Sequence, residues 1–396
     1  MANNIGFTPS NHFEIIKLTL TDRYGNEWDI KDFLIEMNIY HSLFQMTSTG
    51  NLIVGDPSNI RFNQAIFGGE LITIKYKNAG MDKTTELKYV VKCHGEQIQM
   101  NMAAAIRYQL ITEEAFIDSQ KTYSIPFNGD YGSLVKTLLK YTQTEKKISV
   151  GISTINNKQT SAMPYCSPLT GIRWACSRAY GLDKTPFLFY EDVEGYNFKS
   201  IGELLSLPSS GKFYYEPLGL TDDDGLRQLF TIRKLEFKRN TFNHHELAKS
   251  LPNRNQFFFD PRNKSCEKVS TSYESIFNSV PTLEKNKIPY MLQDSAIVWQ
   301  GKLDDNSHSF KVYRDYFVQI LDQFGFKFVT LAGDHLRVGY VYEFDPINTE
   351  VTIDGKKYPE TFIRGRYLLT NIKRTFTTKE YTTSCEIIKD SLFKEV

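Results

Sequence analysis

Hydrophobic and polar positions alternate, with the two-residue period of a half-buried β-strand, through most of the first hundred residues. Turn-forming sequences such as Asp22–Asn26 interrupt the alternation. The alternating segments are 14–20, 35–39, 71–76, 87–93 and 106–112. This pattern predicts an antiparallel β domain, a barrel or a sandwich, over residues 13–117.

A helical spacing replaces the alternation after residue 118. Leu134, Leu138 and Leu139 recur at nearly helical intervals and predict a helix over Tyr131–Thr144. Ser167–Pro168 is typical of an N-cap followed by proline at the first helical position, and an apolar stripe follows it. We expect residues 118–211 to form a separate α+β domain.

Strand patterns return at 212–239 and again in the last seventy residues. Leu336–Phe344 alternates strictly, and Tyr367–Phe376 with Tyr381–Lys389 predicts a closing hairpin around Thr378–Lys379. We expect 212–239 and 325–393 to form a second β-barrel. Residues 240–324 are expected to be an inserted, loop-rich domain that ends in an amphipathic helix over Ser309–Asp322.

One short sequence occurs in similar form twice. Gly69-Glu70-Leu71-Ile72-Thr73-Ile74 resembles Gly333-Asp334-His335-Leu336-Arg337-Val338, since each has a turn glycine, an acid and then alternating apolar residues. Such turns are common, so the similarity indicates a duplicated β module without establishing one.

Composition supports a strand-rich globular protein. Aromatic residues make up 14% of the chain, and aromatic side chains favour strands. Lys plus Arg is 47 and Asp plus Glu is 46, so the basic excess of a dedicated nucleic-acid binder is missing. The five cysteines show no CxxC spacing, which argues against a zinc ribbon or a disulfide scaffold. We expect no signal peptide, because Met1–Gly6 is not a basic segment followed by an apolar core, and no membrane span, because no run of about 18 apolar residues occurs.

Motifs of catalysis are largely missing. No P-loop, GxGxxG or GxSxG sequence occurs. The sequence His244–Lys249 approaches HExxH, but Lys249 replaces the second imidazole, so a zinc site is not expected. Asp222–Asp224 is expected to be a solvated turn, and His41 and His335 are expected to be hydrogen-bonding surface residues. We therefore predict no catalytic, cofactor-binding or metal-binding residue.

A basic run, Arg227 to Arg239, is open to two interpretations. It contains Arg227, Arg233, Lys234, Lys238 and Arg239. We favour a solvated strand face, and the alternative is a patch that faces an acidic partner or passing DNA.

The order of these segments resembles the trimeric baseplate hub proteins of contractile-tailed bacteriophages, the T-even-like hubs that carry the central spike. The resemblance starts with Phe33–Phe44, Gly50–Asp56 and Gly68–Ile74. It continues with Tyr123–Phe127, Thr170–Tyr180 and Phe187–Asp192, and then with Ala332–Asp334 and Gly365–Ile372. It extends in order over nearly the whole chain, except that 240–308 match poorly.

The resemblance implies a β-rich α+β fold with two tube-like split barrels in each chain. It implies a homotrimer whose pseudo-sixfold ring adapts the trimeric central spike to the hexameric tail tube and forms part of the DNA conduit, without sequence-specific DNA binding. The implied partners are the spike, tail tube or tube-initiator proteins and baseplate wedge proteins. The implied location is the virion tail baseplate, assembled in the bacterial host cytoplasm.

Three residues are candidates for an inter-subunit contact. Leu43, Phe44 and Met46 are apolar residues in a predicted turn, and exposed apolar residues suggest burial in a partner. The alternative is that they close the end of their own barrel. A rival function is a tail-associated carbohydrate-binding protein or glycan hydrolase, for which no carboxylate pair can be singled out.

Overall fold

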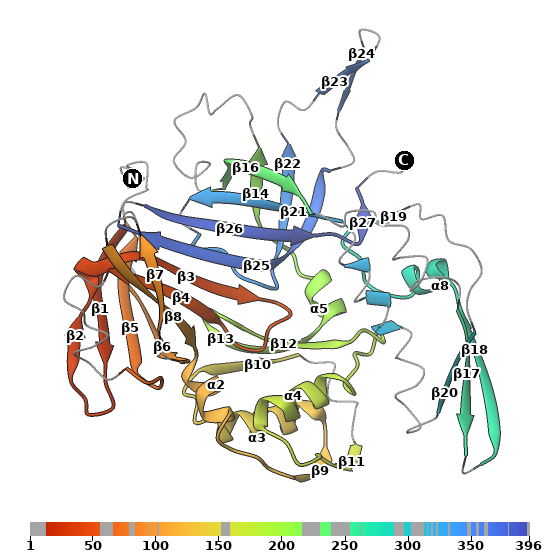
Figure 1. Ribbon diagram of the computed structural model, residues 1–396. Coiled ribbons are helices and arrows are strands. Elements are labelled where there is room, and N and C mark those ends of the chain that lie inside the picture. Colours follow the sequence, from red (N-terminus) through yellow and green to blue (C-terminus); the bar gives the residue numbers. More distant parts are fainter. Residues whose placement is uncertain are drawn as a thin grey trace, which may run out of the picture.

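The computed structural model describes most of the chain. The described residues are 13–55, 66–78, 84–93, 95–100, 103–151, 159–215, 230–238, 254–261, 263–288, 297–301, 313–314, 316–317, 320–321, 324–331, 333–346, 350–353, 356–359, 363–378 and 380–393. The fold is rich in β structure with few and short helices, as the sequence predicts. Fifteen strands belong to one continuous sheet, to which strands from both ends of the chain contribute (Figure 1).

The first β unit contains eight strands and a short 3₁₀ turn, η1 (Lys31–Phe33). The strands are β1 (Phe13–Thr21), β2 (Glu27–Asp29), β3 (Leu34–Ser42), β4 (Thr49–Gly55), β5 (Leu71–Asn78), β6 (Thr84–Val91), β7 (Glu96–Met100) and β8 (Ala103–Ile111). The alternation read from the sequence is confirmed in β5, where Ile72, Ile74 and Tyr76 are buried and their neighbours are half-buried. These side chains join the core of the unit.

The α+β unit follows and packs four helices with five short strands. These elements are α2 (Glu113–Asp118), β9 (Pro126–Gly129), α3 (Tyr131–Tyr141), β10 (Lys147–Val150), β11 (Gln159–Ala162), α4 (Pro168–Cys176), β12 (Phe187–Asp192), β13 (Gly195–Ser200) and α5 (Ile201–Leu205). Leu134, Leu138 and Leu139 of α3 are buried, so the predicted apolar face is confirmed. The Asp130 side chain accepts from Ser133 N and caps α3.

The cap of α4 differs from the prediction. Ser167 is the N-cap residue, but its hydroxyl makes no hydrogen bond to the helix backbone. Instead Asp118 supplies the acceptors: its carboxylate oxygens lie 2.6 Å from Leu169 N and 2.9 Å from Ser167 Oγ. A carboxylate favours the positive end of a helix, so a distant residue replaces the local cap.

The second β unit is built from two separated parts of the chain. Its strands are β14 (Ser209–Tyr215), β15 (Thr231–Ile232), β16 (Lys234–Phe237), β21 (Gly325–Leu331), β22 (Val341–Pro346), β25 (Gly365–Thr377) and β26 (Tyr381–Ile388). The predicted closing hairpin is confirmed as β25–β26. Pairing runs β14–β22–β25–β26–β21–β16, and β15, which directly precedes β16, pairs with β14, so the strand pairings form a closed circuit.

The predicted strand over Leu336–Phe344 is wrong in its first half, because β22 begins at Val341. Leu336 and Val338 are buried all the same, since the preceding loop lies across the core. The carbonyl oxygens of Gly333 and Leu336 accept from the Arg374 side chain rather than from a neighbouring strand. A buried cation thus takes the place of a strand ladder there.

The two β units repeat one arrangement of strands. In the first unit the order across the sheet is β3–β4–β8–β6–β5, and in the second it is β16–β21–β26–β25–β22. All eight pairings are antiparallel, and numbering the strands along the chain gives the order 1-2-5-4-3 in both units. The similar sequences that start at Gly69 and Gly333 both precede the third strand, so strand order and sequence agree on a duplicated module.

The two units meet along β3 and β25, which pair from Ser42 opposite Asn371 to Glu36 opposite Thr377. Figure 1 shows β3 running below the β25–β26 hairpin. Phe376 and Tyr381, near the turn of this hairpin, lie in the core of the first unit. The hairpin of one unit therefore completes the core of the other.

Smaller elements lie around the second unit. They are β17 (Arg254–Asp260), β18 (Ser265–Thr271), α8 (Tyr273–Phe277), β19 (Asn286–Lys287), β20 (Ile297–Gly301), β23 (Glu350–Ile353), β24 (Lys356–Pro359) and β27 (Ser391–Leu392). The predicted helix Ser309–Asp322 lies partly outside the described residues. Its described residues 313–314, 316–317 and 320 are helical, and Tyr316, Phe317 and Ile320 are buried in the core of the second unit.

Candidate functional site: the junction of the β units and the adjoining cleft

A buried arginine lies at the centre of the junction between the β units. Arg374 of β25 is 1% exposed. Its guanidinium donates to the carbonyl oxygen of Leu336 at 3.0 Å and to that of Gly333 at 3.4 Å, and it lies 3.2 Å from His41 Nδ1. Because a guanidinium only donates, Nδ1 of His41 must accept, and the imidazole is neutral. Burial, and then the charges of Arg374 and Lys146, lower the pKa of His41 well below its usual value.

A second part of the junction centres on Asp334. Its carboxylate accepts from the hydroxyl of Tyr381 at 2.7 Å and from that of Tyr76 at 3.2 Å. Burial and the Asp334 charge raise the pKa of Tyr76, and burial also raises that of Tyr381, so both hydroxyls remain donors. Tyr76 belongs to the first unit and Tyr381 to the second, so one carboxylate holds both units.

The prediction that His41 and His335 are surface residues is wrong. His41 is 4% exposed because β3 lies between β4 and β25 in the sheet, which leaves neither edge of the strand open. His335 is half-buried with its ring 4.5 Å from that of Phe230, and burial lowers its pKa to about 4. The His41 ring accepts a hydrogen bond from Arg374, whereas both ring nitrogens of His335 are buried without a hydrogen-bond partner among the described residues.

A cleft of about 500 Å³ adjoins the junction. Its walls come from β6, α2, the loop after α3 and the turn between β12 and β13, so it separates the first β unit from the α+β unit. Lys146 lies on the α+β side of this cleft, and its ammonium lies 3.0 Å from Glu114 Oε2 and 2.8 Å from Glu191 Oε1. The other oxygen of Glu191 accepts from Ser48 N at 2.6 Å.

The charge states of Lys146, Glu114 and Glu191 favour a structural role for these three residues. Burial raises the pKa of Glu191. Burial also acts to raise the pKa of Glu114, but the Lys146 charge and the Thr144 hydroxyl lower it overall. The pKa of Lys146 is raised, because the attraction of Glu191 and Glu114 outweighs the effect of burial. A lysine held in its charged form is a poor base and nucleophile, so this arrangement is suited to holding α2, the loop after α3 and β12 together within the α+β unit.

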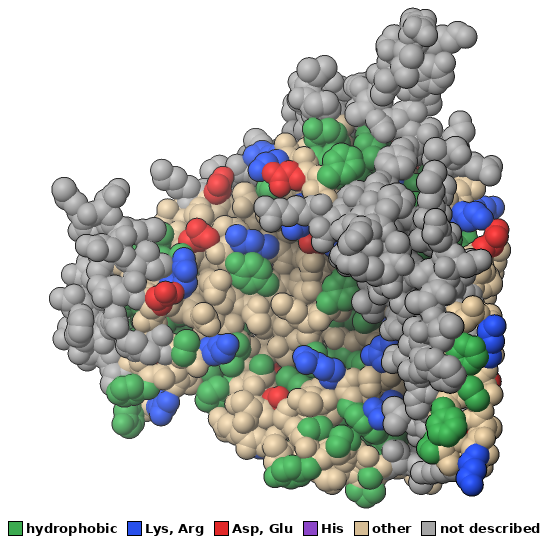
Figure 2. All heavy atoms as spheres, turned by 45° about the vertical axis from the view of Figure 1, so that its right-hand side comes forward, with side chains coloured by type: hydrophobic (Ala, Val, Ile, Leu, Met, Phe, Trp, Pro, Cys, Tyr) green, Lys and Arg blue, Asp and Glu red, His purple; other side chains and the backbone are tan. Residues whose placement is uncertain are grey.

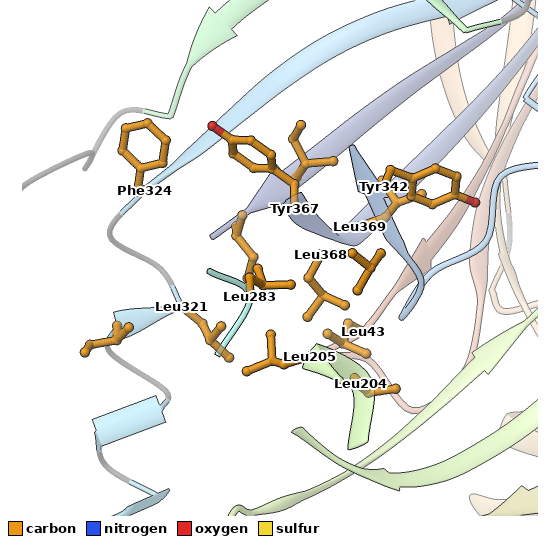
Figure 3. Packing of buried hydrophobic residues seen from close by; sticks show 14 of the residues in the cluster. Leu43, Leu204, Leu205, Leu283, Leu321, Phe324, Tyr342, Tyr367, Leu368 and Leu369 are labelled. Atoms are coloured by element: carbon orange, nitrogen blue, oxygen red, sulfur yellow. The ribbon is translucent and has the colours of Figure 1, made fainter. Parts of the chain in front are cut away.

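The three residues predicted for an inter-subunit contact have different environments. Leu43 is fully buried in the core of the second unit, where Figure 3 shows it next to Leu204 and Leu205 of α5. Met46 is half-buried against the core of the α+β unit. Phe44 is 54% exposed. Leu43 and Met46 therefore pack against parts of their own chain other than the first unit, and Phe44 alone has much of its surface available to a partner.

Exposed large apolar side chains are dispersed over the described surface. The most exposed are Tyr24, Tyr165, Phe67, Leu182, Phe237 and Phe44. On the face in Figure 2 the hydrophobic side chains form small separate patches between Lys and Arg side chains. Small patches of this kind are ordinary on a folded protein, so no single one identifies a binding site.

The remaining predicted candidates lie partly outside the described residues. His244–Lys249, Asp222–Asp224 and the basic residues Arg227 and Arg239 lie outside the described residues. In the basic run, Lys234 pairs with Glu236 at 2.6 Å and Lys238 with Glu386 at 2.6 Å. The described residues contain no group of three His, Cys, Asp or Glu side chains suited to a metal ion, and none of their helices is long and apolar enough to cross a membrane. All five cysteines are free.

Sequence reasoning missed the residues that join the two β units and those that join separate elements of the α+β unit. Lys146, Glu114, Glu191, Arg374 and Asp334 carry no motif, and their partners are far away along the chain. The single local signal is the acid of the repeated turn, since Asp334 follows Gly333 as Glu70 follows Gly69.

No family model matches the sequence, and no curated protein matches it. Solved structures do match. A tail protein from Neisseria meningitidis MC58 covers 95% of this chain and 97% of its own, with a TM-score of 0.56 and 8% identity. The 43 kDa tail protein of prophage MuSo2 from Shewanella oneidensis covers 94% and 98%, with a TM-score of 0.58 and 9% identity. A chain of the lidless PdpA–VgrG complex covers 99% and 67%, with a TM-score of 0.51 and 9% identity.

These identities are too low to transfer an activity or a partner, but the similarity extends over nearly the whole of this chain. The resemblance read from the sequence is therefore confirmed for the fold, and this chain has the fold of a phage tail protein.

Proposed function

We propose that this chain is a structural baseplate hub of a phage tail, which assembles as a homotrimer. The observation that carries the proposal is the duplicated five-strand module within one chain. Three copies would present six similar β units, which is the number needed to match a hexameric tail tube. The three-fold symmetry of the whole would suit a trimeric central spike.

The junction supports a rigid ring rather than two loosely linked domains. The β3–β25 pairing, the Arg374 contacts and the shared Asp334 carboxylate fix the two units relative to each other. Buried polar contacts between two units favour one arrangement of the units over others. Such rigidity suits a conduit for DNA, and the net charge of +1 avoids a strongly basic chain that would retain the genome.

The proposal includes no catalytic role. We infer that Lys146, Glu114 and Glu191 form a structural bridge, because the lysine is paired on both sides. The proposed partners are the spike, tail tube or tube-initiator proteins and baseplate wedge proteins, and the proposed location is the virion baseplate after assembly in the host cytoplasm.

The test is the mass of the full chain by light scattering after size exclusion, over a concentration series. A stable mass near three chains of 45.8 kDa would support the hub, and electron microscopy of that species would then show a six-lobed ring. A chain that remains monomeric at every concentration, also with a spike protein added, would contradict it. Lysis of bacterial cell walls by the purified chain in a turbidity assay would favour a hydrolase.

A further inference from the structure

Two strand edges in the duplicated modules have no partner among the described strands. β16 pairs with β21 on one edge, and β7 pairs with β8 on one edge. An open edge presents unpaired backbone donors and acceptors and is a natural site for another strand.

Because the module is duplicated, each open strand has a counterpart in the other unit. β16 is the first strand of the second unit, and its counterpart is β3, the first strand of the same module in the first unit. β7 corresponds to the far half of β25, because each forms a hairpin with the fifth strand of its unit, β8 or β26. Within the chain, β3 pairs with that far half of β25. The equivalent pair, β16 with β7, does not form within one copy.

We propose that β16 of one copy pairs in antiparallel orientation with β7 of a second copy and repeats the β3–β25 junction between subunits. This inference rests on the proposed hub function and identifies the surface that would form the trimer. The contact joins different surfaces of the two copies, so it propagates head to tail and closes when three copies complete a ring.

The register follows from equivalent positions in the two units. Ile111 faces Thr49 in the first unit, and Ile388 faces Gly325 in the second. Counting from these pairs along the paired strands, Phe237 takes the position of Ile39, which faces Arg374 within the chain.

By the same count, Gln97 takes the position of Arg374. The proposed contact therefore places Phe237 opposite Gln97 of the second copy, Glu236 opposite Ile98 and Lys238 opposite Glu96. The last pair has opposite charges, although Lys238 also pairs with Glu386 at 2.6 Å within its own chain.

Exposure at β16 agrees with an absent partner. Phe237 is 58% exposed, although its ring packs 4.7 Å from that of Phe326 on β21. Its counterpart Ile39 is fully buried in the core of the first unit, and β25 lies beside β3 there. Covering Phe237 with a second copy would give the two units the same environment.

Disulfide cross-linking tests the register directly. The full chain would carry Glu236→Cys and Ile98→Cys, with the exposed Cys93 and Cys266 changed to Ser. Facing residues of paired strands have Cα atoms about 4.5–5.5 Å apart, within the range for a disulfide. The matched control combines Glu236→Cys with Met100→Cys, which is two residues out of register and about 7–8 Å away.

Mild oxidation should convert most of the in-register variant to a covalent trimer on a non-reducing gel, with no larger species. The control and both single-cysteine variants should remain monomers on that gel. If light scattering shows a trimer but the in-register pair does not cross-link, this surface is wrong and the hub function stands. Covalent dimers from Ile98→Cys alone would also overturn it, since β7 would then meet β7. A chain that never self-associates would overturn both proposals.

Discussion

The aromatic rings of Phe376 and Tyr381 lie 4.6 Å apart and within 1° of parallel, inside the core of a β unit to which neither strand belongs. Both residues flank the turn of the β25–β26 hairpin, and they contact Phe13 and Tyr76 of the first unit. The core of the first unit is thus complete only with side chains from the C-terminal part of the chain.

Phe376→Ala should therefore destabilise the whole β structure. A buried phenylalanine replaced by alanine leaves a cavity and costs about 3–5 kcal/mol. We expect that loss in the free energy of unfolding by urea, followed by fluorescence. Phe67→Ala is the matched control, because Phe67 is 71% exposed and should change stability by less than about 0.5 kcal/mol. Equal effects of the two substitutions would show that the hairpin does not complete this core.

Lys146→Met should destabilise the α+β unit, in which Lys146 joins α2 to β12. It leaves two mostly buried carboxylates, Glu114 and Glu191, without their shared cation. Since the lysine side chain is itself 37% exposed, screening reduces the effect, and we expect a loss of about 2 kcal/mol, typical of hydrogen bonds to charged groups.

Two controls test whether the stability loss of Lys146→Met comes from the two carboxylates: its dependence on pH and a substitution of the neighbouring lysine. The deficit should shrink as the pH falls, first when Glu191, whose pKa is raised, takes up a proton and last when Glu114, whose pKa is lowered, does so. Lys147→Met, at an exposed neighbouring position, should have little effect. A deficit that is constant with pH would mean that the carboxylates are not the cause.

Lys389 should make stability depend on pH above neutrality. The side chain is fully buried, its ammonium lies 4.7 Å from the ring centre of Phe324, and burial lowers its pKa to about 7. The unfolded chain binds this proton up to about pH 10.4, so between about pH 7 and 10 the unfolded state holds more protons than the folded state. Lys389 therefore makes the folded state more stable, relative to the unfolded state, as the pH rises from about 7 to about 10.

Denaturant unfolding at pH 7 and pH 9 measures this effect. The natural chain should gain up to about 2 kcal/mol from Lys389 between the two values. In Lys389→Met that gain should be missing, while the folded structure persists because the replacement is apolar and of similar length. The same gain in both proteins would assign the pH dependence to other groups.

Substitutions of the neighbouring residues Leu43 and Phe44 should differ in their effect on the free energy of unfolding. Leu43→Ala should cost about 2–5 kcal/mol, because Leu43 is fully buried in the core of the second unit. Phe44→Asp should leave unfolding nearly unchanged, since the ring is 54% exposed.

Light scattering of the same two variants tests the predicted contact. If Phe44 lies between subunits, Phe44→Asp dissociates the trimer into folded monomers. A trimer that tolerates the charge would leave Phe44 outside the interface.

Local structure and much of the architecture could be predicted from the amino-acid sequence. Alternation at Ile72, Ile74 and Tyr76 identified a strand, the leucines of α3 identified a helix face, and the turns at Gly69 and Gly333 marked equivalent points of two modules. These signals are local, because a strand or helix buries one face with a fixed period whatever lies against it.

Which strand edges pair, and which charged side chains contact each other, depends on the tertiary structure. Periodicity says which face of β3 is buried but not that its edge pairs with β25, some 330 residues later. For the same reason Asp118 caps α4, Lys146 lies between Glu114 and Glu191, and Arg374 takes the carbonyl oxygens of Gly333 and Leu336. A buried polar group must find a partner, and only the folded chain shows which one is within reach.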